Sequence, residues 1–183
     1  YSIGVNFAMN LIAQGLPAAS IENAYIAGAV DQIRDEAKLE DELVQATLEA
    51  FQFRIQGQDE LAANVIAQSA EQLAKLSPLP DLDLTQEDDR VAYSIGLNTG
   101  QNLMEQSLSR NSNLQAFISG VKERVNGAAR LSVTEVMDAI QIMQQRSEQQ
   151  RQLVLQRLQE MNQKFLQENA TKDGVTQLDN GVQ

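Results

Sequence analysis

The stretch that decides the fold is Tyr1-Ser-Ile-Gly-Val-Asn6, which recurs as Tyr93-Ser-Ile-Gly-Leu-Asn98 in a chain of 183 residues. Tyr93 lies 92 positions after Tyr1, and the same shift without a gap aligns several further positions: Tyr25 with Phe117, Gly28 with Gly120, Val44 with Val136, Leu48 with Ile140 and Phe51 with Met143. Self-similarity at a fixed distance is the signature of a sequence repeat. The chain is therefore predicted to be a tandem duplication.

The first copy begins with two short helices. Apolar residues recur every four positions at Ile3, Phe7 and Leu11, which predicts a helix that Gly15 and Pro17 bring to an end. Ser20 stands where it can cap a second helix. Apolar residues on one face extend this second helix to about Ala37.

The third helix of each copy is predicted to be long. A stripe of mainly apolar residues runs at spacings of three and four over positions 44–76 in the first copy and 136–165 in the second, with Gln58, Ser69, Ser147 and Gln150 as its polar members. Ser132 and Glu135 form a capping box, so the second of these helices is predicted to span about 133–169. A rod of this length exposes an apolar stripe that it cannot cover alone.

These patterns predict an all-α fold of two three-helix repeats, each with two short helices and one long helix, packed as an intertwined module with pseudo-two-fold symmetry. Pro78 and Pro80 end the first repeat, and Thr85 is the expected cap of the next helix. Because Tyr93 then lies two turns inside a helix, Tyr1 is expected to follow further helical residues. The predicted organisation is a first repeat over 1–76, a linker over 77–84, a second repeat over 85–169 and a connecting segment over 170–183.

Composition excludes most catalytic chemistry. Histidine, cysteine and tryptophan are absent, which removes histidine bases, cysteine nucleophiles, disulfides and His/Cys metal sites. The excess of 25 acidic over 14 basic residues gives a net charge of -11, which disfavours nucleic acid and anionic membrane surfaces as partners. No apolar run is long enough to predict membrane insertion. The acidic group over 81–89 lacks the glycine of a calcium loop, so no catalytic, cofactor or metal site is predicted.

The candidate functional residues are instead those that pack helices together. Gly28 and Gly120 each cost a helix about 1 kcal/mol relative to alanine, and their equivalent positions beside Tyr25 and Phe117 predict the close approach of another helix. The full predicted interface consists of Ile3, Phe7, Leu11, Tyr25, Gly28, Val44, Leu48, Phe51, Ile95, Phe117, Gly120, Val136, Ile140 and Met143.

The Tyr-Ser-Ile-Gly-x-Asn stretch, the helix with Ile26-Ala27-Gly28 and the long third helix resemble the N-terminal domain of FKBP-type peptidyl-prolyl cis-trans isomerases of the macrophage infectivity potentiator-like group. Residues 174–183 resemble the entry into the catalytic domain of that family. The resemblance implies that N-terminal helices of two subunits interlock, that each long helix carries a catalytic domain, and that the protein works in the bacterial periplasm or cell envelope. The proline-binding pocket of that catalytic domain has no counterpart here, so no catalytic residue is carried over.

Two functions follow as hypotheses. In the first, the chain is a dimerisation and chaperone module that positions an isomerase domain and holds unfolded or proline-containing clients. In the second, it is an independent helical adaptor or holdase without an isomerase domain. Because two copies in one chain raise the effective concentration of the partner copy, an intramolecular pseudo-dimer is expected. A homodimer formed by helix exchange is the other arrangement that the sequence allows.

Overall fold

The computed structural model describes residues 1–79, 82–106, 108, 111–172 and 174–176. In this part of the chain the regular elements are helices, and a single isolated bridge joins Leu79 and Leu82. The predicted all-α class is therefore confirmed. The chain divides into one compact unit over Tyr1–Met137 and another over Asp138–Gln183. None of the helices in the described residues is both long enough and apolar enough to span a bilayer.

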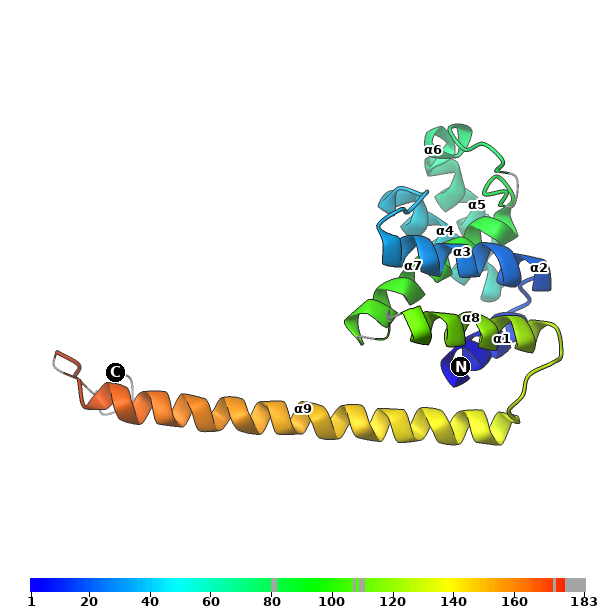
Figure 1. Cartoon of the computed structure of the whole chain (residues 1–183). Coiled ribbons are helices and arrows are strands. Elements are labelled where there is room, and N and C mark those ends of the chain that lie inside the picture. Colours follow the sequence, from blue (N-terminus) through cyan, green and yellow to red (C-terminus); the bar gives the residue numbers. More distant parts are fainter. Residues whose placement is uncertain (80–81, 107, 109–110, 173, 177–183) are drawn as a thin grey trace. The chain divides into compact units, whose positions relative to one another are not determined.

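In the first unit, helices that are distant in sequence lie side by side. Helix α1 packs against α8, and α3 packs against α7, which also contacts α4 (Figure 1). A continuous apolar core joins residues from both predicted repeats. The helices before the long C-terminal one are α1 (Ser2–Ala13), α2 (Ala18–Ser20), the π-helical η1 (Ile21–Tyr25), α3 (Ile26–Arg34), α4 (Asp41–Ile55), α5 (Asp59–Gln68), α6 (Ala70–Ala74), α7 (Glu87–Glu105) and α8 (Asn111–Val125).

Helix α1 ends where the sequence predicts. Gly15 adopts the left-handed conformation with φ 87°, which glycine reaches without a steric penalty. The Leu16 N–H donates to the Leu11 carbonyl oxygen at 3.1 Å and the Gly15 N–H donates to that of Ile12 at 3.0 Å. These bonds form a Schellman motif, which satisfies carbonyl groups that the helix end leaves free.

The prediction of one long third helix in the first copy was wrong. Gly57 has φ 73° and ends α4 with the same motif, because the Gln58 N–H donates to the Phe53 carbonyl oxygen at 2.9 Å and the Gly57 N–H donates to that of Arg54 at 2.9 Å. The chain then turns and continues as α5 and α6. The stripe of apolar spacings passes through this break, so periodicity alone did not detect it.

The predicted cap at Ser20 was also wrong. The helical segment begins at Ala18 directly after Pro17, and Ser20 lies buried inside it without a capping bond from its side chain. Proline fits the start of a helix because the missing N–H has no partner there. The segment ends at Arg34 rather than Ala37, since Asp35 takes the left-handed conformation with φ 59°.

Thr85 does not cap α7. Its backbone N–H and its hydroxyl both donate to the Asp83 carboxylate, at 3.1 and 2.5 Å, and the pKa of that carboxyl is lowered by the same bonds. This is an Asx-type turn that precedes the helix.

The linker between the two predicted repeats is not exposed along its whole length, because Leu82 and Leu84 are buried in the core. Residues 80–81, which include a predicted linker proline, lie outside the described part of the chain.

Helix α9 (Val133–Ala170) starts at the predicted residue and spans 38 residues. The predicted capping box is confirmed: the Ser132 N–H donates to the Glu135 carboxylate at 2.8 Å, and the Glu135 N–H donates to the Ser132 hydroxyl oxygen at 3.3 Å. These bonds from Ser132 lower the pKa of the Glu135 carboxyl. Residues 177–183, which carry part of the family resemblance, lie outside the described residues.

Candidate functional site

The main candidate site is the reciprocal interface, which we define as the two contacts of α3 with α7 and of α1 with α8. In the first contact, glycines remove the side chain where the backbones meet. A Cβ atom on Gly28 would overlap the Tyr93 carbonyl oxygen, and one on Gly96 would overlap the Tyr25 carbonyl oxygen. Backbone atoms cannot rotate away as a side chain can. The approach of α3 to α7 therefore requires glycine at both positions.

The second contact repeats the first. A Cβ atom on Gly4 would overlap the Phe117 carbonyl oxygen, and one on Gly120 would overlap the Tyr1 carbonyl oxygen. Gly4 and Gly96 lie 92 positions apart, as do Gly28 and Gly120, and the carbonyl groups that they meet are related by the same shift. Each contact thus joins a helix from one half of the sequence to a helix from the other half.

A buried polar group reinforces the contact of α3 with α7. The Tyr93 hydroxyl donates to the Asp31 carboxylate at 2.8 Å and accepts a hydrogen bond from the Lys38 N–H at 2.9 Å. The Lys38 ammonium forms an ion pair with Asp31 and lies 5.9 Å from the centre of the Tyr93 ring. Burial, followed by the hydrogen bond to Asp31, raises the pKa of the Tyr93 phenol. We call these three residues the Tyr93 cluster.

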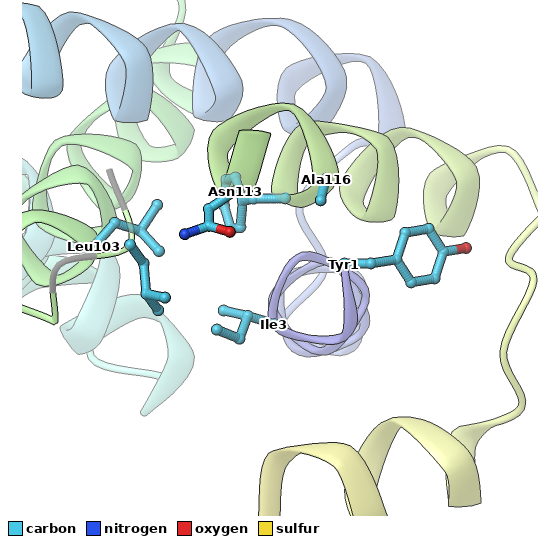
Figure 2. Close-up of a pocket in the computed structure, with 7 residues that line it drawn as sticks. Tyr1, Ile3, Leu103, Asn113 and Ala116 are labelled. Carbon is cyan, nitrogen blue, oxygen red and sulfur yellow. The ribbon is translucent and has the colours of Figure 1, made fainter. Parts of the chain in front are cut away.

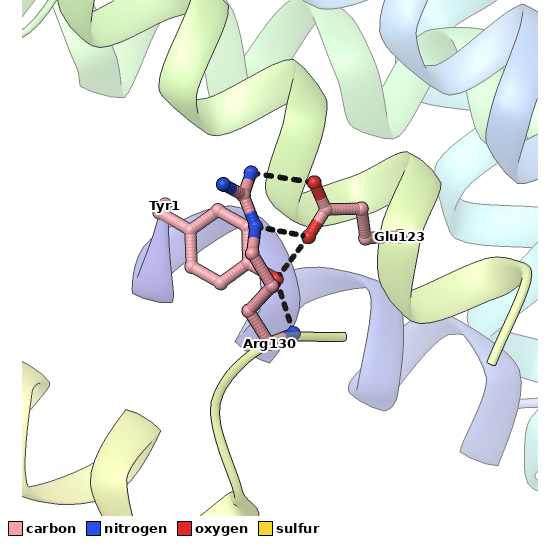
Figure 3. A network of polar contacts seen from close by, with 3 residues as sticks. All are labelled: Tyr1, Glu123 and Arg130. Carbon is pink, nitrogen blue, oxygen red and sulfur yellow. Dashed lines mark hydrogen bonds and ion pairs between the residues drawn. The ribbon is translucent and has the colours of Figure 1, made fainter. Parts of the chain in front are cut away.

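An equivalent group, the Tyr1 cluster, lies at the contact of α1 with α8 (Figure 3). The Tyr1 hydroxyl donates to the Glu123 carboxylate at 2.5 Å and accepts a hydrogen bond from the Arg130 N–H at 2.8 Å. The Arg130 guanidinium donates twice to Glu123, at 2.9 and 2.5 Å, and lies 5.0 Å from the centre of the Tyr1 ring. The bonds from Arg130, and then the one from Tyr1, lower the pKa of the Glu123 carboxyl.

Replacing Tyr93 by phenylalanine is expected to destabilise the first unit by about 2 kcal/mol, because Asp31 is 7% exposed and would lose a buried partner. Tyr1→Phe is the matched control, and a smaller loss is expected because Glu123 is partly exposed and keeps both bonds from Arg130. Urea unfolding followed by circular dichroism measures both. Equal losses in the two variants would contradict the role assigned to burial of the Tyr93 cluster.

An aromatic group joins the two contacts at the centre of the unit. The ring of Phe7 lies 6.3 Å from that of Tyr25 and 6.5 Å from that of Phe117, and the last two rings are 6.1 Å apart, measured between centroids. These distances are typical of favourable aromatic pairs. Phe7 and Tyr25 come from the first half of the sequence and Phe117 from the second, so this group also crosses between the halves.

Two shallow hollows open beside the interface, with volumes of about 90 and 250 Å³. Figure 2 shows Ile3, Leu103 and Asn113 directed toward the smaller one, whereas the Tyr1 ring points away. The larger hollow is lined by Ile3, Phe7, Thr99, Asn102, Leu103 and Gln106. None of the side chains that line either hollow is charged, so the hollows offer apolar contact and amide hydrogen bonds rather than acid–base chemistry.

The structure brings most of the predicted interface residues into or against the core of the first unit. Leu11, Tyr25, Gly28, Val44, Phe117, Gly120 and Val136 are buried, and Ile3, Phe7, Leu48, Phe51 and Ile95 are half-buried and pack against the core. Ile140 and Met143 are half-buried in the second unit. The prediction missed Gly4, Gly96 and the acidic and basic members of the tyrosine clusters. The sequence did contain a pattern that pointed to these charged residues, because a shift of 92 positions aligns Asp31 with Glu123 and Lys38 with Arg130.

Helix α9 presents a second candidate surface. Its large apolar side chains are widely exposed, with 66% of Met161 and 58% of Phe165 accessible. The exposed apolar residues of the second unit are Ile142, Leu153, Val154, Leu155, Leu158, Met161, Phe165 and Leu166. Exposed apolar area of this extent marks an interaction surface. Within the described residues, no cluster of three or more potential metal ligands is found.

Comparison with known families gives one result. The family model described as the domain amino terminal to FKBP-type peptidyl-prolyl isomerase matches residues 88–183. This range contains α8, α9 and all of α7 except its first residue, Glu87, and therefore one half of each contact in the reciprocal interface. No curated protein and no solved structure gives a significant match.

Proposed function

Because the chain belongs to the family of helical domains amino-terminal to FKBP-type peptidyl-prolyl isomerases, we propose that it serves as the dimerisation and chaperone module of such an isomerase. In this proposal the first unit is the assembly platform, and α9 positions a catalytic domain and contributes a surface that holds folding clients. The helices of residues 1–176 carry no isomerase activity in this proposal, because they offer packing surfaces rather than a proline-binding pocket.

The platform is proposed to be a tandem duplication that forms a pseudo-dimer within one chain. Three observations support this proposal. Two are sets of contacts, those of the glycines and those of the Tyr1 and Tyr93 clusters, and the third is the spacing of the helix boundaries. Helix α4 begins at Asp41 and α9 at Val133, which are 92 positions apart, and α1 and α7 end at Ala13 and Glu105, again 92 positions apart. A homodimer would need two chains to supply these paired helices, whereas here one chain supplies both.

The observation that carries the proposal is the reciprocal interface. Helices from each half of the sequence are covered by helices from the other half within residues 1–137, and in this proposal that core takes the place of a core formed by two chains. Within α9 Val136 is the buried residue, so the contacts of the first unit do not use the apolar face further along that helix. Its exposed apolar face then supports the second part of the proposal, the holding of clients.

Solution measurements on the chain test both parts. Light scattering is expected to give a particle of 20.2 kDa, and a stable particle of twice that mass would contradict the pseudo-dimer. The chain is also expected to slow the aggregation of a chemically unfolded model protein, while showing no activity in a prolyl isomerase assay. If a parent protein lacked a β-rich domain after residue 183, the role as an independent adaptor or holdase would replace the isomerase assignment.

A further inference from the structure

The two contacts of the reciprocal interface differ in the helical turn that follows the crossing glycine of α1 or α7. In α7 this turn carries Thr99 and Gly100, whereas the aligned positions of α1 are Phe7 and Ala8. Thr99, Gly100 and Ala8 are buried and Phe7 is half-buried. The two contacts therefore share their crossing glycines but differ in the packed residues beside them.

Gly100 allows α3 to lie very close to α7. A Cβ atom on Gly100 would lie 2.5 Å from the Ala29 carbonyl oxygen and 2.7 Å from the Gln32 Cβ. The carbonyl oxygen belongs to the backbone, so relief would require α3 to move away from α7. Helix α1 carries Ala8 at the aligned position. Helix α3 thus accepts α7 at a spacing that the side chain of Ala8 would not permit.

Thr99 is a small residue beside the Tyr25 hydroxyl. Burial raises the pKa of the Tyr25 phenol and the Thr99 side chain acts in the opposite direction, which places the two side chains next to each other. No hydrogen bond of ordinary geometry is found for this hydroxyl within the described residues, so the two side chains are matched mainly in size. The aligned positions in the other contact are Phe7 and Phe117, whose ring centroids are 6.5 Å apart.

Pairing either half of the sequence with a copy of itself would mismatch these side chains. Two first halves would place Phe7 where Thr99 now stands beside Tyr25, and would bring Ala8 to the position where α3 requires glycine. Two second halves would place Thr99 beside Phe117 and leave space beside a buried ring. Overpacked and underpacked contacts both lower stability. The pairing of a first half with a second half avoids both defects.

We infer that Thr99 and Gly100 select the partner of α3, so that a first half pairs with a second half and rejects the first half of another copy. This inference rests on the proposed pseudo-dimer and names the residues that decide which halves meet. Specificity between two similar partners requires a cost for the wrong one. Here that cost is the overlap that the phenylalanine and alanine of α1 would produce against α3.

Giving α7 the residues of α1 tests the inference in the full chain. The double substitution Thr99→Phe with Gly100→Ala should raise the unfolding constant about hundredfold, typical of overpacking, which urea unfolding measures as a lower midpoint. This loss is expected although alanine favours a helix more than glycine does. Asn98→Phe is the matched control, because Asn98 is exposed on the same helix, and a change below about threefold is expected. An unchanged midpoint for the double variant would overturn the inference.

A compensating substitution separates partner selection from a general intolerance of bulk. Tyr25→Phe removes the hydroxyl and gives that position the residue type that the other contact uses. Thr99→Phe should raise the unfolding constant about tenfold by itself, and less than about threefold when combined with Tyr25→Phe. Tyr25→Phe alone should change the midpoint little, because its hydroxyl lacks a hydrogen bond of ordinary geometry in the described part of the chain. Strictly additive effects would overturn the inference.

Particle mass distinguishes the inference from the function on which it rests. By light scattering the double variant should remain at 20.2 kDa, because another copy's first half presents the same residue types that α3 rejects. A particle of twice that mass for the double variant, with the wild-type chain at the single mass, would show that first halves pair and would overturn the inference alone. Twice the mass for the wild-type chain, with the compensation by Tyr25→Phe observed, would overturn the intramolecular pseudo-dimer and support the same selection between chains.

Discussion

Replacing Gly96 by alanine is expected to destabilise the first unit by about 3 kcal/mol, the upper part of the usual cost of overpacking. The added Cβ would overlap the Tyr25 carbonyl oxygen and lie 3.1 Å from the Gly28 Cα. Both neighbours are backbone atoms, so relief requires α3 and α7 to move apart. That movement would also strain the Tyr93 cluster, which joins the same two helices.

Urea unfolding of the Gly96→Ala variant measures this loss as a lower midpoint. Asn98→Ala is the matched control, because Asn98 is exposed on the same helix, and a change of no more than about 0.5 kcal/mol is expected there. The Gly28→Ala variant should behave like Gly96→Ala, since the two glycines meet at the same crossing. An unchanged midpoint for Gly96→Ala would mean that the helices do not approach as closely as the structure shows.

Replacing Phe117 by alanine is expected to cost about 4 kcal/mol, typical of a buried phenylalanine whose cavity cannot collapse. Phe117 is 2% exposed and contacts the rings of Phe7 and Tyr25. Because these partners come from the first half of the sequence, the substitution weakens the contact between the halves and not one half alone. We therefore expect both halves to unfold together, in one transition at a lower urea concentration.

The same substitution in α9 provides the control. Phe165 is 58% exposed and belongs to the second unit, so Phe165→Ala should leave the unfolding midpoint of the first unit unchanged. Measuring the transition with the tyrosine signal reports on the first unit, which contains all three tyrosines of the chain. Two separate transitions in Phe117→Ala, with one half still folded, would contradict the reciprocal interface.

Local chemistry explains which helix boundaries could be predicted. The capping box at Ser132 and the glycine at position 15 act within a few residues of the chain, and both predictions were correct. The break at Gly57 uses the same local chemistry as the one at Gly15, but it falls within a run of helical spacings. At the aligned position of the second half stands Gln149, which favours the helix, and α9 continues through it.

The predicted interface shows the limit of spacing arguments. Gly28 and Gly120 stood out because glycine is costly inside a helix, and the structure places both against a helix backbone. Asp31 and Lys38 did not stand out, because charged residues near the end of a helix are common on exposed surfaces. Their role depends on the Tyr93 hydroxyl, which approaches from a helix 55 to 62 positions further along the chain.

By itself, the sequence determined the all-α class and the start of α9, because these depend on side-chain periodicity and on hydrogen bonds between near neighbours. Only the tertiary structure decided that α1 pairs with α8 and α3 with α7. An apolar helix face has the same spacing whichever helix covers it, so the choice of partner rests on how closely two backbones can approach. Here five glycines at the crossings permit that approach: Gly4, Gly28, Gly96, Gly100 and Gly120.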